Sequence, residues 1–172
     1  MATVPTLAPV NPPLGPQVPD AKFYSPQQVT LALRERVFSF TGDDFTVQTA
    51  DGTPICKCKA ALVSLHGKKK FTDMQGNEIF TLSNKLALQK SFKGEAPDPS
   101  HNFEITGHFK LMGSKSSIHF KNASDGKEIE LGLEGKWTGH KAEITWEGRP
   151  IAAINREFFN ARNFFGGKDT VS

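Results

Sequence analysis

The sequence is poor in residues that form cross-links and metal sites. Its 172 residues contain only two cysteines, Cys56 and Cys58. Two positions apart in a strand, they point to the same face, a spacing along the strand that does not suit a disulfide. A structural zinc site needs about four ligands, and the chain has no second cysteine pair. We therefore expect two reduced thiols, which fits a reducing compartment.

Long hydrophobic runs are also lacking. No apolar run approaches the ~18 residues that a membrane-spanning helix needs, so we expect no transmembrane segment. The N-terminus shows no charged segment followed by an apolar one, as a signal peptide would. These absences predict a cytoplasmic protein, with peripheral attachment to a membrane or a nuclear location as open alternatives.

Motifs of catalysis and cofactor binding are missing as well. The five histidines are scattered, at His66, His101, His108, His119 and His140, without the spacing of a helical metal site. The chain has no phosphate-binding glycine loop and no nucleophile elbow. We therefore predict a non-enzymatic domain without cofactor or metal.

The net charge is small, at +3. A charge of this size permits an anionic partner but does not by itself indicate nucleic acid. Single-stranded nucleic acid is usually held by aromatic side chains among basic ones, and no such platform is evident. No nucleic-acid partner is expected.

Proline is concentrated at the N-terminus. Seven of the eleven prolines lie within residues 1–28. Proline lacks an N–H and cannot join the interior of a sheet, so residues 1–26 are predicted to form a disordered or polyproline-like tail. A ligand for a proline-binding module is the alternative. Residues 27–172 then form one folded domain.

The remainder of the chain has the pattern of a β-meander. Val29, Leu31 and Leu33 alternate with polar or small residues, as strand residues with one buried face do. Turn signals such as Asp51-Gly52 and Gln75-Gly76-Asn77 recur at short, regular spacing. The pattern predicts at least eight strands between residues 29 and 156 and very little helix. By the same pattern, residues 92–102 are expected to form a loop.

Residues 103–121 are predicted to form a hairpin with a basic outer face. If Gly113 to Ser116 is its loop, Phe109 pairs with Phe120 and Leu111 with Ile118 on the inner face. The outer face and tip then gather His108, Lys110, Lys115, His119 and Lys121.

A second basic run follows Gly67. Lys68, Lys69 and Lys70 stand at a turn or strand start. A solvated turn is the simpler interpretation, and an anion-binding site is the alternative.

Several motifs resemble the LURP-one-related family, which belongs to the tubby C-terminal-like superfamily with the tubby and phospholipid scramblase domains. They are Leu33, Gly42-Asp43-Asp44-Phe45, Asp51-Gly52, the set Phe71, Asp73, Gly76, Asn77 and Ile79, then Leu86, and finally Gly166 with Lys168-Asp169-Thr170. The resemblance implies an all-β, antiparallel tubby-like barrel around a C-terminal central helix. The chain ends at Ser172, so we expect the barrel to lack that helix and to be C-terminally truncated.

The same resemblance implies a binding or scaffold domain that docks on anionic membrane lipid, such as phosphoinositide head groups. The candidate ligand-binding residues are Lys68, Lys69, Lys70, His108, Lys110, Lys115, His119 and Lys121. A protein–protein interaction module or a nuclear regulatory factor without lipid binding is the alternative. Phospholipid scramblase activity is the least favoured interpretation, because no apolar helix is present to anchor the chain.

Overall fold

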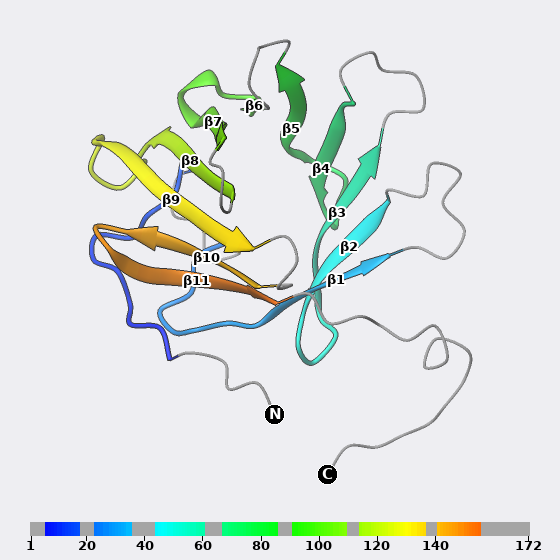
Figure 1. Ribbon diagram of the computed structural model, residues 1–172. Helices are drawn as coiled ribbons and strands as arrows, with labels where there is room; N and C mark the ends of the chain where they lie inside the picture. Colours follow the sequence, from blue (N-terminus) through cyan, green and yellow to red (C-terminus); the bar gives the residue numbers. More distant parts are fainter. Residues whose placement is uncertain are drawn as a thin grey trace.

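The computed structural model describes residues 6–17, 23–35, 44–60, 67–85, 91–109, 114–136 and 141–155. These residues contain eleven strands and one short 3-10 helix (Figure 1). The first six strands are β1 (Leu31–Glu35), β2 (Phe45–Thr49), β3 (Pro54–Ala60), β4 (Lys69–Asp73), β5 (Glu78–Lys85) and β6 (Ser91–Glu95). After the 3-10 helix η1 (Pro99–His101) come β7 (Phe103–Phe109), β8 (Ser114–Lys121), β9 (Glu128–Lys136), β10 (Lys141–Trp146) and β11 (Arg149–Asn155). The predicted all-β class and the predicted minimum number of strands are confirmed.

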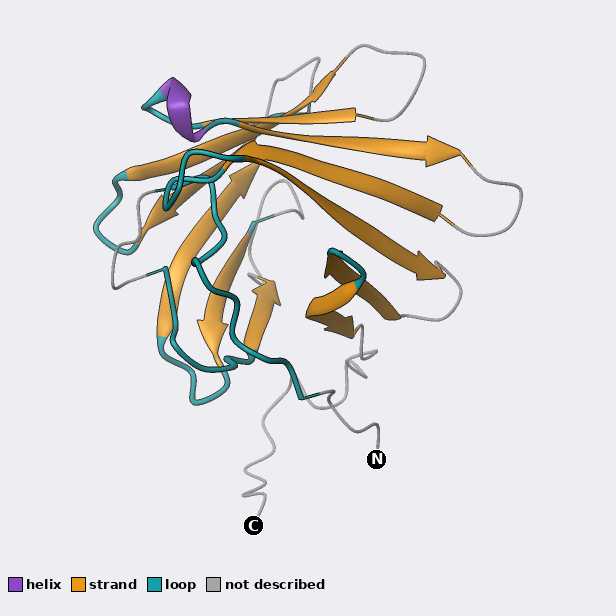
Figure 2. Cartoon of the chain, turned by 90° about the vertical axis from the view of Figure 1, so that its left-hand side faces the viewer, coloured by secondary structure: helices purple, strands orange, loops and turns teal. Residues whose placement is uncertain are grey.

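All eleven strands belong to one antiparallel meander. Each strand pairs with its neighbours along the chain, in the order β1 to β11. The sheet is strongly curved, and the strands of its two halves run in clearly different directions (Figure 2). Such a meander needs only tight turns between strands, which is what the regular spacing of turn residues predicts.

The expectation of a closed barrel is wrong. Within the described part of the chain, β1 is paired only with β2, and β11 only with β10. The sheet therefore keeps two edges instead of closing on itself. Alternation of apolar and polar residues predicts strands and their two faces, but closure requires a pairing between the first and last strands that this pattern does not encode.

The inner face of the sheet carries the hydrophobic core. Phe120, Ile129 and Leu131 are buried there on neighbouring strands, with Phe120 opposite Ile129. Partly buried side chains packed against them are Leu14, Phe103, Ile118, Ile144, Trp146 and Ile151. These residues follow the two-residue period of the sequence, which sends alternate side chains to opposite faces.

A row of four phenylalanines extends the core across the first half of the sheet. The ring centroids of Phe45 and Phe71 are 5.9 Å apart, those of Phe71 and Phe80 4.4 Å, and those of Phe80 and Phe103 5.1 Å. Offset and edge-to-face pairs of this kind each contribute roughly 0.5–1.5 kcal/mol beyond the burial of their area. The row connects strands that are not neighbours in the sheet. The rings of Phe45 and Phe71 meet across β3, and those of Phe80 and Phe103 meet across β6.

Glycine at position 94 makes room for the last ring of this row. Gly94 on β6 lies directly opposite Phe103 on β7 and is buried. A Cβ atom at position 94 would lie only 2.2 Å from the Phe103 ring. The phenylalanine ring thus occupies the space that any other side chain at position 94 would need.

The N-terminal proline-rich segment is in contact with the sheet. Leu14 packs on the core, and the Gly15 N–H donates to Asn122 Oδ1 at 3.0 Å. The Ala123 N–H in turn donates to the carbonyl of Gly15 at 3.0 Å. The expected domain boundary at residue 26 stays a prediction, but residues 13–15 are held against the turn between β8 and β9.

Residues 92–102 differ from the expected loop. They include most of β6 and all of η1, with Phe92 opposite Ile105. Prolines and a glycine mark this stretch as a loop in the sequence. Pairing with β5 and β7 on both sides determines the strand, which is a tertiary effect. The part of the chain that is described contains no helix of the length and apolarity that a bilayer crossing requires.

Candidate functional site

The predicted register of the basic hairpin is wrong. Phe103 pairs with Phe120 and Ile105 with Ile118, whereas Phe109 lies opposite Ser114. β7 ends at Phe109 and β8 already begins at Ser114, so the expected loop from Gly113 to Ser116 falls largely within β8. The inner and outer faces of the two strands are nevertheless as predicted. The observed pairing differs from the predicted one by an even number of residues, and such a shift leaves each side chain on its face.

The observed register places acids beside the hairpin's basic residues. On β9, Glu134 lies opposite Lys115, Glu130 opposite His119, and Glu128 opposite Lys121. Lys115 Nζ forms an ion pair with the Glu134 carboxylate. On the other side of β8, His119 lies opposite Glu104 of β7. The outer face of this hairpin therefore carries alternating charge rather than a basic cluster.

Two of the hairpin candidates are not tested by this geometry. Lys110 lies outside the described residues. The backbone of His108 pairs with that of Lys115, but the His108 side chain is also outside them. Their contribution to an anion site stays a prediction.

The outer face of β3 and β4 gathers lysines instead. Lys57 and Lys59 alternate along β3 with Cys56 and Cys58, which point to the inner face. Lys59 lies directly opposite Lys70 on β4, and exposed Lys68 immediately precedes that strand. We call Lys57, Lys59, Lys68 and Lys70 the β3–β4 lysine patch. Sequence reasoning found Lys68 and Lys70 but missed Lys57 and Lys59, although the Cys-Lys-Cys-Lys alternation was the signal for them.

The third lysine of the predicted basic run is placed differently. Lys69 lies opposite Ala60 on β3 and opposite Leu82 on β5, and it is half-buried. Because neighbouring strand residues point to opposite faces, Lys69 does not join Lys70 on the outer face. The run Lys68–Lys70 is thus divided between the two sides of the sheet.

Carboxylates lie beside two members of the lysine patch. The hydrogen bond from Lys93, and to a smaller extent the charge of Lys68, hold the pKa of Glu95 below its usual value. Lys70 Nζ lies 2.7 Å from Glu78 Oε2. The hydrogen bond from Lys70, followed by that from Thr81, holds the pKa of Glu78 below its usual value. No carboxylate in the described ranges forms an ion pair with Lys57 or Lys59, so at least these two charges stay uncompensated by an acid there.

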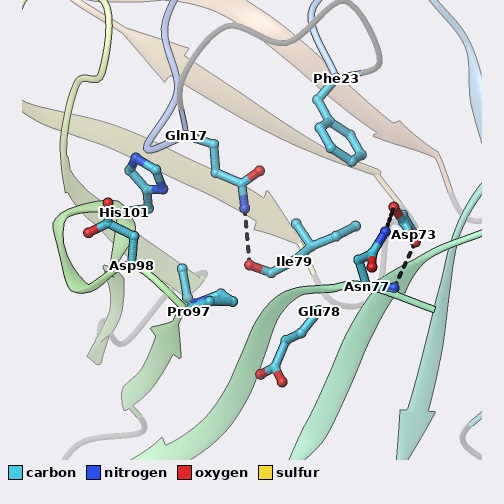
Figure 3. A pocket seen from close by; sticks show the side chains of 10 residues that line it. Gln17, Phe23, Asp73, Asn77, Glu78, Ile79, Pro97, Asp98 and His101 are labelled. Atoms are coloured by element: carbon cyan, nitrogen blue, oxygen red, sulfur yellow. Dashed lines mark hydrogen bonds between the residues drawn. The ribbon is translucent and has the colours of Figure 1, made fainter. Parts of the chain in front are cut away.

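A small cavity lies elsewhere, at the end of the sheet where the N-terminal segment crosses the turn between β4 and β5. Its volume is about 260 Å³, below the usual range for ligand pockets. Figure 3 shows Gln17 at its centre, with Gln17 Nε2 donating to the carbonyl of Ile79 at 3.1 Å. The lining residues are Gln17, Phe23, Asp73, Asn77, Glu78, Ile79, Ala96, Pro97, Asp98 and His101.

The polar groups of this cavity are engaged in holding the fold. Asp73 Oδ1 accepts the N–H of Gln75. Asp73 Oδ1 also accepts the N–H of Asn77, and Asp73 Oδ2 accepts from Asn77 Nδ2 (Figure 3). Asp98 Oδ1 accepts from both the N–H and the hydroxyl of Ser100. These bonds shape the turn between β4 and β5 and the start of η1, so the motif Asp73-x-x-Gly76-Asn77 has a structural explanation. The lysine patch is therefore the stronger candidate site.

The two thiols are placed for low reactivity. Cys58 is 1% exposed, and burial raises the pKa of the half-buried Cys56 thiol. The reactive species is the thiolate, so a raised pKa slows alkylation at neutral pH. We expect iodoacetamide to modify the native chain at least about tenfold more slowly than the urea-unfolded chain, as followed by mass spectrometry. Equal rates in the two states would contradict the burial of these thiols.

The likeness to known proteins covers most of the chain. The profile of the LURP-one-related family matches residues 29–172. Protein LURP1 of Arabidopsis thaliana is 26% identical over 159 residues, which is 88% of this chain and 77% of the relative. Protein LURP-one-related 15 of the same plant is 23% identical over 169 residues, covering 94% of this chain and 78% of the relative. No solved structure gives a significant match. Because this family profile matches well over half of the chain, the chain belongs to the LURP-one-related family.

Proposed function

We propose that this chain is a non-enzymatic binding domain that docks on anionic membrane lipid through the β3–β4 lysine patch. The observation that carries the proposal is the placement of Lys59 directly opposite Lys70 on the outer face. Like charges in directly opposed positions destabilise a sheet. A bound anion between the two strands would remove that cost.

The arrangement differs from that on β8 and β9, although like charges also stand opposite each other elsewhere on the outer face, at Glu134 and Glu143. Every basic residue of β8 faces a glutamate on β9, so opposite charges alternate there. On β3 and β4, Lys57 faces Thr72 and Lys59 faces Lys70. Glu134 has Lys115 beside it as an ion-pair partner, whereas Lys57 and Lys59 form no ion pair with a carboxylate of the described residues, which supports an anionic ligand at the patch.

The expected affinity is modest and dependent on salt. A lysine near an anionic leaflet contributes about 1 kcal/mol, so Lys57 and Lys59 supply ~2 kcal/mol together. Lys68 and Lys70 add less, because Glu95 and Glu78 partly offset their charges. Exposed charges are screened within roughly 8 Å at physiological ionic strength. These magnitudes suit reversible attachment at a membrane surface. Lys115 and Lys121 would add less, because the glutamates opposite them offset their charge.

Neutralising two lysines of the patch tests the proposal. In the double variant Lys57→Gln/Lys59→Gln, the partition coefficient onto phosphatidylcholine vesicles containing phosphatidylserine should fall about 30-fold, for ~2 kcal/mol lost. The residual binding should depend less on salt. Thermal stability should be unchanged or slightly higher, because the repulsion between Lys59 and Lys70 is removed. Vesicle co-sedimentation and a melting curve measure the two effects.

A matched variant on the other hairpin serves as the control. Lys115→Gln/Lys121→Gln removes the same charge and should lower vesicle binding at most a few-fold. If vesicle binding falls more in this variant than in the patch variant, the binding site lies on the hairpin of β7 and β8 instead. If the native chain binds phosphatidylserine vesicles no better than pure phosphatidylcholine, membrane docking is wrong and the protein-interaction alternative takes its place.

A further inference from the structure

The large apolar side chains that the sheet exposes are concentrated at its edges. Leu31 and Leu33 of β1 are 51% and 62% exposed, and Val29, just before the strand, is 45% exposed. All three positions alternate, so they share one face of the edge strand. At the opposite edge, Ile154 of β11 is also exposed. An exposed apolar edge strand is a template for pairing with another chain.

The two edges differ in how well they are protected. β11 contains Pro150, which has no N–H to donate, and its pairing with β10 shifts register between Ile144 and Thr145. Prolines and bulges are devices that prevent pairing at a sheet edge. β1 has no proline and no irregularity in its pairing with β2, and its two charged residues, Arg34 and Glu35, stand at its end, beyond the apolar stretch from Val29 to Leu33. In the sheet formed by the described residues, the edge that is open to pairing is therefore β1.

We propose that β1 pairs antiparallel with β1 of a second copy of this chain, about a two-fold axis at Leu31. In this register Leu31 faces its own symmetry mate, and Val29 faces Leu33 of the second copy. All three exposed apolar side chains are then covered by one another. On the other face of the joined sheet, Thr30 stands opposite Ala32 of the second copy.

Charge and apolar content select this register. With Leu31 on the axis, Arg34 stands opposite Gln28 of the second copy and Glu35 opposite Gln27, so no like charges face each other. Moving the axis to Ala32 places Glu35 opposite Val29. Moving it to Thr30 leaves Leu33 opposite Gln27. Only the proposed register pairs every exposed apolar residue of the edge with another.

Symmetry then limits the assembly to a dimer. A two-fold contact uses the same surface of both copies and leaves nothing further to pair at that edge. Pairing of β1 with β11 of a second copy would instead be head-to-tail and would grow into open chains. Pro150 and the register shift in β11 disfavour that arrangement.

Sedimentation velocity of the full chain over a range of concentrations tests the proposal. We expect a reversible species of about twice the 18.9 kDa of one chain. Leu33→Lys should abolish it, because the ammonium group would face Val29 of the second copy in an apolar row. Folding of this variant should be retained, since Leu33 is largely exposed, and circular dichroism verifies that. Ile154→Lys, the same change at the other edge, should leave the dimer intact.

A disulfide tests the register itself. Directly opposed residues in antiparallel strands have Cα atoms roughly 4.5–5.5 Å apart, within the range that a disulfide spans. Leu31→Cys should therefore give a covalent dimer under mild oxidation, whereas Thr30→Cys, whose symmetry mate is displaced along the strand, should cross-link poorly. The native chain controls for Cys56 and Cys58.

Three results would overturn the proposal. The native chain could stay monomeric at every concentration. The Ile154→Lys variant could dissociate the assembly as completely as Leu33→Lys does. Species larger than a dimer could grow with concentration, which would indicate head-to-tail pairing.

Discussion

Replacing Asn122 by alanine is expected to destabilise the fold by about 2–3 kcal/mol, because the side chain is fully buried and fully hydrogen-bonded. Its Oδ1 accepts the Gly15 N–H, and its Nδ2 donates to Asp125 Oδ1 at 2.8 Å. Alanine would leave the partly buried Gly15 N–H without its acceptor. Urea unfolding followed by circular dichroism gives the loss in the free energy of unfolding.

The same substitution should release the N-terminal segment. Without the bond from Gly15, that segment loses one of the contacts that hold it on the turn between β8 and β9. Limited proteolysis should then cut within residues 6–17 faster than in the native chain. Ser124→Ala is the matched control, since the exposed Ser124 hydroxyl donates only to the Pro13 carbonyl, at 2.8 Å. A stability loss in Asn122→Ala no greater than in this control would contradict the role given to Asn122.

Replacing Gly94 by alanine is expected to destabilise the fold by about 1–3 kcal/mol through overpacking. The added Cβ would lie 2.2 Å from the Phe103 ring, which is already packed edge-on against Phe80. The ring can escape only by leaving the aromatic row, and the backbone of β6 is held by ladders on both sides. Thermal melting should show the loss.

A glycine on β9 provides the control. A Cβ at Gly132 would meet only the Thr145 hydroxyl, at 2.8 Å, and that group can rotate away. Gly132→Ala should therefore cost less than Gly94→Ala. Adding Phe103→Leu to Gly94→Ala should restore part of the lost stability, because the leucine side chain is smaller than the ring. A double variant with losses that simply add would show that the ring is not the obstacle.

The strands and their faces could be predicted from the sequence because they depend on local patterns. The alternation of Val29, Leu31 and Leu33 places β1, and the Asp-Gly and Gly-Asn pairs mark the turns. The family motifs identified the LURP-one-related family, which the profile match confirms. The inner and outer faces of β7 and β8 were also assigned correctly, since a side chain's direction depends only on its parity along the strand.

The candidate site depended on which residues stand opposite one another. The sequence suggested a basic face on the hairpin of β7 and β8, but the observed register sets Glu130 beside His119 and Glu128 beside Lys121. The register of β3 and β4 likewise sets Lys59 opposite Lys70 and so creates the lysine patch. Register is set by how the inner apolar residues pack across strands, so a local pattern does not reveal which charges meet.

The sequence by itself therefore determined the fold class, the family and the two faces of each strand, because these follow from neighbours along the chain. Only the tertiary structure decided which lysines gather, how the proline-rich segment is held, and that the sheet of the described residues is not closed and exposes apolar side chains at β1. Each of these depends on contacts between residues far apart in sequence, such as Gly15 with Asn122. Such contacts are selected by the packing of the whole sheet, and a segment alone does not contain them.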